Sequence, residues 1–365
     1  MAKCELGVYY WSNWHPSEEN DLKRGKGWTE WEYLKQAIPR FAGHHQPKIP
    51  IWGYLDDSKT ETLQMQIDTA ADHGIDSFIF DYDWCKTADN AELLAFENAP
   101  NTNRLKFGLM FCCPDIPDDL EGFFSNVVHS HFSRPNYWRV NGGLYFSVYE
   151  FHKFVKKLGS VEAVAQKFNL FREMTRQAGL GEIHLVAVEW GLQKHNWEGL
   201  NGTPEELICA LKINAVTTYT WYHNTAPTWP TGLYRSWAEK AYGCMEELLS
   251  TLPVPYYPNV SVGWDPSPRC MPNMRYVEGG PLQYHTLSGE FELFAEPYFS
   301  GITKEDTPEE LEWAARRVKA MAQKVNSPVI TMNAWNEWTE GAFLEPDSQY
   351  GYGKLEAVRN VFKEE

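Results

Sequence analysis

Residues 307–341 read TPEELEWAARRVKAMAQKVNSPVITMNAWNEWTEG, and this stretch contains one complete unit of the predicted fold. Apolar side chains first recur at helical spacing, at Leu311, Ala315, Val318, Ala322 and Val325. The turn sequence Asn326-Ser327-Pro328 follows, and the apolar run Val329–Ala334 then predicts a buried strand. A helix that leads through a short turn into a buried strand is the repeating unit of a parallel α/β fold.

Seven more runs of this strand type precede Val329–Ala334 along the chain. They are Leu6–Tyr10, Ile75–Phe80, Phe107–Phe111, Leu144–Val148, His184–Val188, Ala215–Tyr219 and Tyr257–Val262. Helical patterns or loops separate neighbouring runs, and eight strands in such an alternation are the number found in a TIM barrel. The sequence therefore predicts an α/β fold, a (β/α)8 TIM barrel, in which residues 1–365 form a single domain.

Two connections between the predicted strands are unusually long. Asp115–Asn141 and Trp221–Tyr256 both contain many Trp, Tyr, His or Pro residues. Connections of this length usually carry function, so they predict long loops at the C-terminal face of the barrel. No linker, low-complexity tract or internal repeat marks a domain boundary.

Three helix starts are predicted from capping boxes, in which a hydroxyl side chain is followed three residues later by a glutamate. The pairs are Ser58 with Glu61, Thr203 with Glu206, and Thr307 with Glu310. In the second and third pairs a proline occupies the first helical position, where its missing N–H costs nothing. These signals place helices between the predicted strands.

The charge of the chain excludes some classes of partner. The 365 residues include 33 Lys and Arg against 49 Asp and Glu, so the net charge of −16 would repel nucleic acids and anionic membranes. No apolar stretch reaches the 18 or so residues of a membrane span, and no signal-peptide core precedes the first strand. The expected location stays open between the cytoplasm and, after loss of a leader, the bacterial periplasm or cell envelope. The oligomeric state is not predicted.

The cysteine pattern indicates neither a disulfide scaffold nor a zinc site. Seven cysteines form no C-x-x-C pair and no regular spacing. Cys112 and Cys113 lie in an apolar run and are expected to be buried thiols. A redox role for this pair is the alternative.

Aromatic and acidic side chains gather where the predicted strands end, which is where barrel enzymes place their active sites. The chain has 16 Trp, 19 Tyr and 19 Phe, which together make 15% of its residues. Sugars present flat C–H faces ringed by hydroxyls, so aromatic rings and carboxylates together suit them, although core packing is the alternative for many of these rings. The candidate sugar-contacting residues are Asp81, Asp83, Trp84, Glu189, Trp190, Tyr222, Trp264 and Asn336.

The last strand leads into the sequence Trp335-Asn336-Glu337-Trp338-Thr339-Glu340-Gly341, which contains the candidate catalytic residues. If the backbone turns helically after Asn336, Glu337 and Glu340 lie on one side, about 5–6 Å apart at Cβ. Two carboxyl groups this close can hold different protonation states, which is what acid and base roles in glycosidic cleavage need. The alternative is a pair of structural glutamates, one a cap and the other in a salt bridge.

Other catalytic chemistries lack their sequence signatures. The histidines form no H-x-H or H-E-x-x-H pattern, and His44 and His45 are neighbours whose side chains diverge in an extended segment. No G-x-S-x-G, P-loop or dinucleotide-binding motif occurs. The sequence therefore predicts no metal and no cofactor, and an oligo- or polysaccharide as the partner.

Several motifs together resemble the WbsX-like proteins, relatives of glycoside hydrolase family 99. The N-terminal ones are His15-Pro16, Glu19-Asn20-Asp21, Gly25-Lys26-Gly27-Trp28-Thr29-Glu30-Trp31 and Gly43-His44-His45-Gln46-Pro47. The C-terminal ones are Gly263-Trp264-Asp265, Pro268-Arg269, Asn333-Ala334-Trp335-Asn336-Glu337-Trp338, Glu340-Gly341 and Leu344-Glu345-Pro346-Asp347. The motifs bracket most of the chain, and the glutamate motif is the most specific of them.

The resemblance implies a catalytic (β/α)8 barrel and retaining hydrolysis of α-linked sugars, which are mannosides for the endo-acting members of family 99. It implies a route through a 1,2-anhydro sugar, in which Glu337 takes the proton from the sugar O2. Glu340 would protonate the leaving oxygen and later activate water. The resemblance also adds His15 and Trp31 to the sugar-contacting candidates, and it implies a glycan of the bacterial cell envelope.

Two segments depart from the family pattern. Asp81-Tyr82-Asp83-Trp84 replaces a more tyrosine-rich run, and Cys112-Cys113-Pro114-Asp115 stands where the pattern has an Asn-Glu-Asn-Trp type of sequence. These loops are expected to line the sugar subsites. A non-catalytic glycan-binding or polysaccharide-assembly protein is therefore the alternative function, and a transferase is a third, because an acceptor can replace water.

Overall fold

The computed structural model of the protein describes residues 4–39, 43–84, 90–113, 115–229, 231–269, 281–285, 291–297 and 301–363. Its centre is a sheet of parallel strands, with neighbours in the order β10, β14, β1, β2, β3, β5, β6, β7, β9. The bounds are β1 (Glu5–Tyr10), β2 (Ser77–Tyr82), β3 (Lys106–Phe111), β5 (Gly143–Val148), β6 (Ile183–Val188), β7 (Ala215–Thr217), β9 (Tyr256–Tyr257), β10 (Asn259–Ser261) and β14 (Val329–Asn333). All eight predicted strands are present.

The sheet closes into a barrel through the segment that contains β9 and β10. β9 pairs with β7, and β10 pairs with β14, so a single segment interrupted at Pro258 joins the two edges. Side chains reinforce the joint, because the Thr217 hydroxyl donates to the Tyr257 carbonyl over 3.0 Å and lies 2.9 Å from the Thr331 hydroxyl. The predicted (β/α)8 TIM barrel is therefore confirmed.

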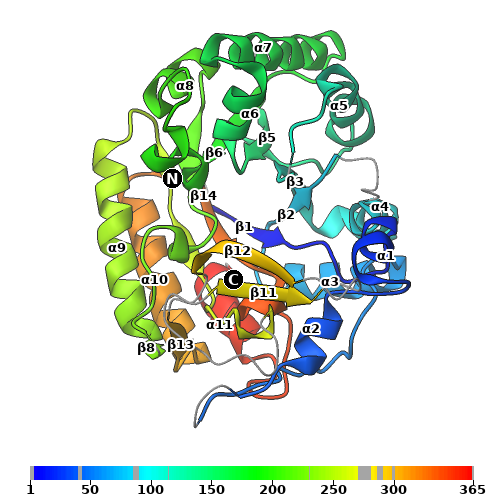
Figure 1. Cartoon of the computed structure of the whole chain (residues 1–365), viewed down its shortest axis with the longest axis vertical. Helices are drawn as coiled ribbons and strands as arrows, with labels where there is room; N and C mark the ends of the chain where they lie inside the picture. Colours follow the sequence, from blue (N-terminus) through cyan, green and yellow to red (C-terminus); the bar gives the residue numbers. More distant parts are fainter. Residues whose placement is uncertain are drawn as a thin grey trace.

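Helices surround the strands on the outside (Figure 1). Between successive strands lie α3 (Thr60–Asp72), α4 (Ala91–Asn98), α5 (Leu120–Asn126), α6 (Phe151–Leu158), α7 (Val161–Gln177), α8 (Pro204–Leu211), α9 (Tyr234–Thr251) and α10 (Pro308–Lys324), and α11 (Gly353–Phe362) follows β14. The apolar stripe predicted for residues 311–325 faces the core in α10, where Leu311, Ala315, Val318 and Ala322 are buried. Val325, which follows the helix, is exposed.

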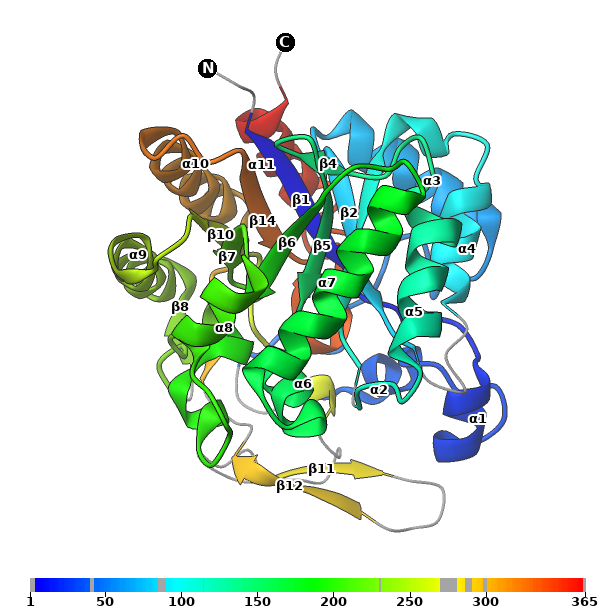
Figure 2. The ribbon, with the colours of Figure 1, turned by 90° about the horizontal axis from the view of Figure 1, so that it is seen from above.

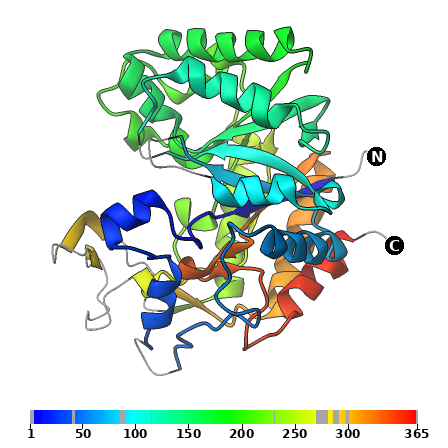
Figure 3. The same ribbon diagram turned by 90° about the vertical axis from the view of Figure 1, so that its right-hand side faces the viewer.

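Smaller elements decorate the barrel. The helices α1 (Glu18–Arg24) and α2 (Trp31–Gln36) lie between β1 and α3. Paired short strands are β4 (Arg139–Val140) with β5, β8 (Thr231–Leu233) with β13 (Ile302–Lys304), β11 (Pro281–His285) with β12 (Phe291–Pro297), and β15 (Asn336–Glu337) with β16 (Ala342–Phe343). In Figures 2 and 3 the two termini lie at one end of the barrel, and α1 and α2 lie at the other. That second end carries the loops that follow the strands.

The barrel interior is filled by large side chains, with Trp138 among the largest fully buried ones. Its indole N–H donates to Glu5 over 2.6 Å. Gly7 on β1 leaves room for the ring, since a Cβ there would lie 2.7 Å from the Trp138 side chain. A second, larger cluster fills the space between the strands and the helices. The interior is thus a packed core, as the barrel fold requires.

The structure corrects two of the local predictions. Ser58 does not cap α3, because its hydroxyl donates to Asp56 and the helix begins at Thr60 with Lys59 before it. The stretches predicted as long loops contain helices instead, namely α5 in the first and α9 in the second.

The other two helix starts agree with the structure. Thr203 and Glu206 form a full capping box at α8. Thr307 accepts from the Glu310 N–H at α10, and a proline is the first residue of each helix. Among the described residues, no helix is both long and apolar enough to cross a membrane.

Candidate active site

The chain turns sharply after the last barrel strand. Asn336–Glu337 pairs with Ala342–Phe343 as a two-residue ladder, and a single 3-10 turn over Trp338–Glu340 connects them. Gly341 ends the turn with φ 70°, a left-handed conformation that favours glycine. The predicted bend after Asn336 is present, and it separates Glu337 and Glu340 by one helical turn.

Both glutamates bind one guanidinium group. Arg269 Nη2 lies 2.6 Å from Glu337 Oε1, and Arg269 Nη1 donates to Glu340 Oε1. The Tyr219 hydroxyl donates to the second oxygen of Glu337 over 3.2 Å. The two carboxyl groups therefore face the same side of the turn and meet at a single cation.

A third carboxylate, Glu30, holds this arginine in place. Glu30 Oε1 accepts from Arg269 Nε and Nη2 at 3.2 and 3.0 Å, and also from the Thr339 hydroxyl. Its other oxygen accepts from Trp11 Nε1 and Asn13 Nδ2, both at 2.9 Å. Although burial opposes it, the charge of Arg269 and these hydrogen bonds lower the pKa of Glu30, so it stays ionised.

The pair is electrostatically asymmetric. Burial, and then the negative charge of Glu340, raise the pKa of Glu337 well above its usual range, while Arg269 opposes this shift. Asp81 lies close enough to add to the effect, and its own pKa is raised well above the usual range by burial and then by the charge of Glu340. Burial and the neighbouring carboxylate therefore favour the protonated form of Glu337 more than in an isolated glutamate. One neutral acid beside one carboxylate can supply both partners of acid–base catalysis.

Asp265 anchors the loop that carries Arg269. Its carboxylate accepts from His44 Nε2 at 2.8 Å, from Gln46 Nε2 at 2.7 Å and from the Ser267 backbone N–H at 3.1 Å. Burial opposes ionisation, but the hydrogen bond and charge of His44 lower the pKa of Asp265 to about 2. The Asp265 backbone N–H also donates to the Glu340 carbonyl, which connects this loop to the turn that contains Glu340.

Gly341→Ala is expected to lower the thermal unfolding midpoint markedly. A Cβ at this position would lie 2.8 Å from Asp265 Cβ and 2.9 Å from its backbone nitrogen, in addition to the strain of φ +70°. Gly351→Ala is the matched control, because Gly351 has φ +58° with nothing within 4 Å of the added Cβ. The control should lose only about 1–2 kcal/mol of backbone strain. Equal midpoints for the two variants in thermal unfolding would contradict the close packing of the turn on Asp265.

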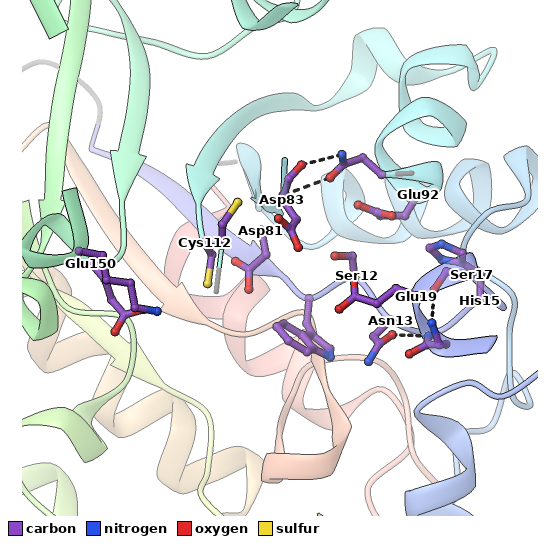
Figure 4. Close-up of a pocket in the computed structure, with 15 residues that line it drawn as sticks. Ser12, Asn13, His15, Ser17, Glu19, Asp81, Asp83, Glu92, Cys112 and Glu150 are labelled. Atoms are coloured by element: carbon purple, nitrogen blue, oxygen red, sulfur yellow. Dashed lines mark hydrogen bonds and ion pairs between the residues drawn. The ribbon is translucent and has the colours of Figure 1, made fainter. Parts of the chain in front are cut away.

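A pocket of about 360 Å³ lies beside the glutamate pair (Figure 4). Its wall includes Trp11 and Asp81, and both residues connect it to the glutamate pair. Trp11 donates a hydrogen bond to Glu30, and its ring centre lies 5.8 Å from the Arg269 guanidinium carbon. Asp81 interacts electrostatically with Glu340. Glu337 and Glu340 are not among the residues that line it. The pocket therefore adjoins the candidate catalytic groups through two shared residues.

Of the predicted sugar-contacting residues, His15, Asp81 and Asp83 line this pocket. The His15 ring is also held in position by Asp57, because its Nδ1 lies 2.6 Å from Asp57 Oδ1. Trp84 follows the pocket-lining residue Asp83 in the sequence and packs on Phe123, with ring centres 5.8 Å apart.

A second group of the predicted residues follows other barrel strands. Tyr222 and Trp264 stack in parallel at 4.2 Å, and Trp190 packs on the His223 ring at 4.9 Å. Burial raises the pKa of Glu189 to about 7. These four residues are not part of the pocket wall, so the structure divides the predicted set between two places.

Trp31 and Asn336 are not brought to the pocket wall. Trp31 is buried, donates its indole N–H to the Leu55 carbonyl at 2.7 Å, and packs against Trp14 at 4.0 Å between ring centres. The Asn336 amide instead bonds both the backbone N–H and the carbonyl of Trp11. Both residues make contacts with neighbouring segments of the chain instead of lining the pocket.

The sequence interpretation missed Arg269, Glu30 and Tyr219 as members of the site. Glu30 and Arg269 stand inside the motifs quoted for the family resemblance, so membership in those motifs was the available signal. Tyr219 is the last residue of a predicted strand, and its position at a strand end was the corresponding signal.

Comparison with known proteins finds a family model, two curated relatives and several solved structures that are similar to this chain. The family model described as "Glycosyltransferase WbsX" matches residues 7–113 and 297–358, which include Glu30, Glu337 and Glu340. The predicted resemblance to the WbsX family is confirmed. Two curated relatives, the uncharacterized WxcX proteins of two strains of Xanthomonas campestris pv. campestris, are 26% identical to the chain over 380 residues. The match covers 98% of this chain and 49% of each relative, so the chain spans about half the length of these relatives.

Solved structures share the barrel. A glycoside hydrolase-like protein superposes with a TM-score of 0.61 at 14% identity, covering 100% of this chain and 95% of the other. The GH99 endo-α-mannosidase from Bacteroides thetaiotaomicron superposes with a TM-score of 0.58 at 13% identity, covering 99% and 96% of the two chains. At these identities the likeness shows the barrel fold of this chain.

Proposed function

We propose that the protein is a retaining glycoside hydrolase that acts on α-linked, mannoside-like sugars of a complex or bacterial polysaccharide. In this proposal residues 1–365 form one catalytic barrel, and Glu337 and Glu340 are the reacting pair. The observation that carries it is the meeting of two buried carboxyl groups at one guanidinium, close to a pocket. The barrel shared with an endo-α-mannosidase supports the choice of substrate class.

The proposed reaction follows the 1,2-anhydro route. Glu337 takes the proton of the sugar O2, O2 attacks C1, and Glu340 gives its proton to the departing glycosidic oxygen. In the second half, Glu340 takes a proton from water, the water oxygen attacks C1, and the C1–O2 bond breaks as O2 regains its proton from Glu337. Two inversions at C1 give net retention.

This sequence of steps requires the shared proton to change place. In the unliganded protein the raised pKa of Glu337 favours its protonated form. A sugar hydroxyl that donates to Glu337 stabilises its charged form, and a carboxylate so stabilised releases its proton to a neighbour. Because Arg269 contacts both groups, the proton can pass to Glu340 without leaving an unbalanced charge. Substrate binding would thus set the catalytic protonation state.

Product analysis tests the proposal. The wild-type protein is incubated with α-mannosides and a panel of bacterial polysaccharides, and new reducing ends are followed by NMR. Release of reducing ends whose first-formed anomer is α supports a retaining hydrolase. Binding in calorimetry without release across the panel would instead support the non-catalytic glycan-binding function.

A transferase is the second candidate, and the description of the matching family model as a glycosyltransferase favours it. The same reactive sugar could be captured by an acceptor hydroxyl in place of water. Adding acceptor sugars to the assay separates the two functions. Transfer products that exceed free reducing ends at modest acceptor concentration would favour the transferase.

A further inference from the structure

The pocket beside the glutamate pair is strongly acidic. Among the described residues in its wall, five are carboxylic acids and one is a lysine, Lys153. The acids are Glu19, Asp81, Asp83, Glu92 and Glu150. Its volume of about 360 Å³ falls within the range of small-molecule sites, about 300–1,000 Å³.

Two lysines neutralise two of the carboxylates that line this pocket. Lys153 forms an ion pair with Glu150, and Lys23 forms one with Glu19 at 2.5 Å. Asp81, at the end of β2, lies deeper, and the neighbouring charges that act on it most strongly, those of Glu340 and Glu92, are both negative. The floor of the pocket therefore has a negative potential that these two lysines do not cancel.

Asp81, which lines this space, has a buried carboxyl oxygen without a hydrogen-bond partner. Its residue is 6% exposed, and its Oδ1 has no hydrogen-bond partner. In Figure 4 the carboxyl group lies between Cys112 and Ser12 in the middle of the lining side chains. A buried oxygen without a partner costs about 1–3 kcal/mol, so a ligand that donates to it would recover that free energy.

The charges and side chains around Asp81 indicate which class of ligand the pocket can bind. An anionic sugar, such as a uronate or a phosphorylated sugar, would be repelled by the acidic wall. Among the residues that the structure describes, no three His, Cys, Asp or Glu side chains form a group that could hold a metal ion. The described groups therefore suit an organic cation better than a metal.

We propose that this pocket is a subsite for a sugar that carries a free amino group, whose ammonium binds the Asp81 carboxylate beside the bond that the Glu337 and Glu340 pair cleaves. This rests on the proposed function, and it adds the substrate class. An ammonium group has three N–H donors, so it can bind Asp81 and a neighbouring acceptor at the same time. The pyranose ring would lie against Trp11, the aromatic side chain in the wall. Binding of the cation would also bring the pKa of Asp81 back toward its usual range.

Equilibrium binding of matched sugars tests the proposal on the wild-type protein. The probes are methyl α-hexosides with a free amino group at carbon 2, 3, 4 or 6, together with the parent hydroxy sugar, the N-acetyl form and the uronate. At least one free amine should bind about tenfold or more tightly than its parent and its N-acetyl form, because a charged hydrogen bond contributes about 1.5–3 kcal/mol. The uronate should bind most weakly.

An Asp81→Asn variant tests the role of the carboxylate. It should reduce the ratio of the affinities for the amine and for the parent sugar to about threefold or less. Asp68→Asn is the matched control, because Asp68 pairs with Arg104 on the outer surface of α3 and should preserve the full preference.

The outcomes of this test separate the subsite from the proposed function, since binding does not require turnover. If no amine is preferred, or if none binds at millimolar concentration, the subsite proposal is wrong even where the protein hydrolyses other glycans. An unchanged preference in a folded Asp81→Asn variant also overturns it. A clear preference in a protein that releases no reducing ends would support the subsite and count against hydrolysis.

Discussion

Glu337→Gln and Glu340→Gln are each expected to lower kcat by about 10²–10⁴ on a polysaccharide that the wild-type protein cleaves, because each removes a positioned acid or base. Glutamine keeps the shape of the side chain and introduces no charge into the buried site. The thermal unfolding midpoint should therefore stay close to that of the wild type. Steady-state kinetics together with thermal unfolding measures both quantities.

Glu312→Gln is the control for the same change away from the site, because Glu312 forms an exposed ion pair with Arg316 on α10. It should keep full activity. If Glu337→Gln or Glu340→Gln keeps it as well, the assignment of the reacting pair is wrong.

An activated substrate distinguishes the two glutamates. An aryl α-glycoside with an acidic phenol needs no proton on its leaving oxygen, so the variant that lacks the general acid should regain much of its activity on it. The proposed roles predict this recovery for Glu340→Gln alone. Recovery for Glu337→Gln alone would show that Glu337, and not Glu340, protonates the leaving group.

The barrel could be predicted from the sequence because its strands are local patterns. Each of the eight apolar runs is buried on both sides, so its residues are apolar almost without interruption. The helix α9 was missed although Tyr234, Trp237, Ala238, Ala241 and Tyr242 are buried at helical spacing. The stretch was predicted as a long functional loop, whereas its aromatic side chains pack between the helix and the barrel.

The candidate site could be predicted only where it depends on nearby residues. The bend that brings Glu337 and Glu340 together lies within four residues of sequence, so its spacing is visible. The contact of Arg269 with Glu30 joins positions 239 residues apart, and no local pattern encodes such a contact. Which wall residues share one pocket likewise depends on how the loops fold back over the barrel end.

Arg269→Ala is expected to be the most destabilising single change at the site. The variant leaves Glu30, Glu337 and Glu340 buried without their shared cation, and breaking a buried ion pair costs about 3–5 kcal/mol. Arg235→Ala is the matched control, because Arg235 makes two hydrogen bonds to Glu310 at the exposed surface. That exposed pair should contribute little to stability, because solvent screens it. Thermal unfolding at neutral pH compares the two variants.

The effect of Arg269→Ala should depend on pH in a defined direction. The lowered pKa of Glu30 means that its stabilising contribution is present above its unfolded pKa, about 4.3, and is lost as the pH falls through its folded value. Without Arg269, burial raises the pKa of Glu30, so its ionisation opposes folding as the pH rises. The gap to the wild type should therefore widen from about pH 4.5 to about pH 8. Adding Glu30→Gln removes one of the uncompensated charges, so the double variant should be more stable than Arg269→Ala at the higher pH. A gap that is independent of pH, with no recovery in the double variant, would mean that Arg269 acts through packing alone, and then the charge balance proposed for the glutamate pair would have no support.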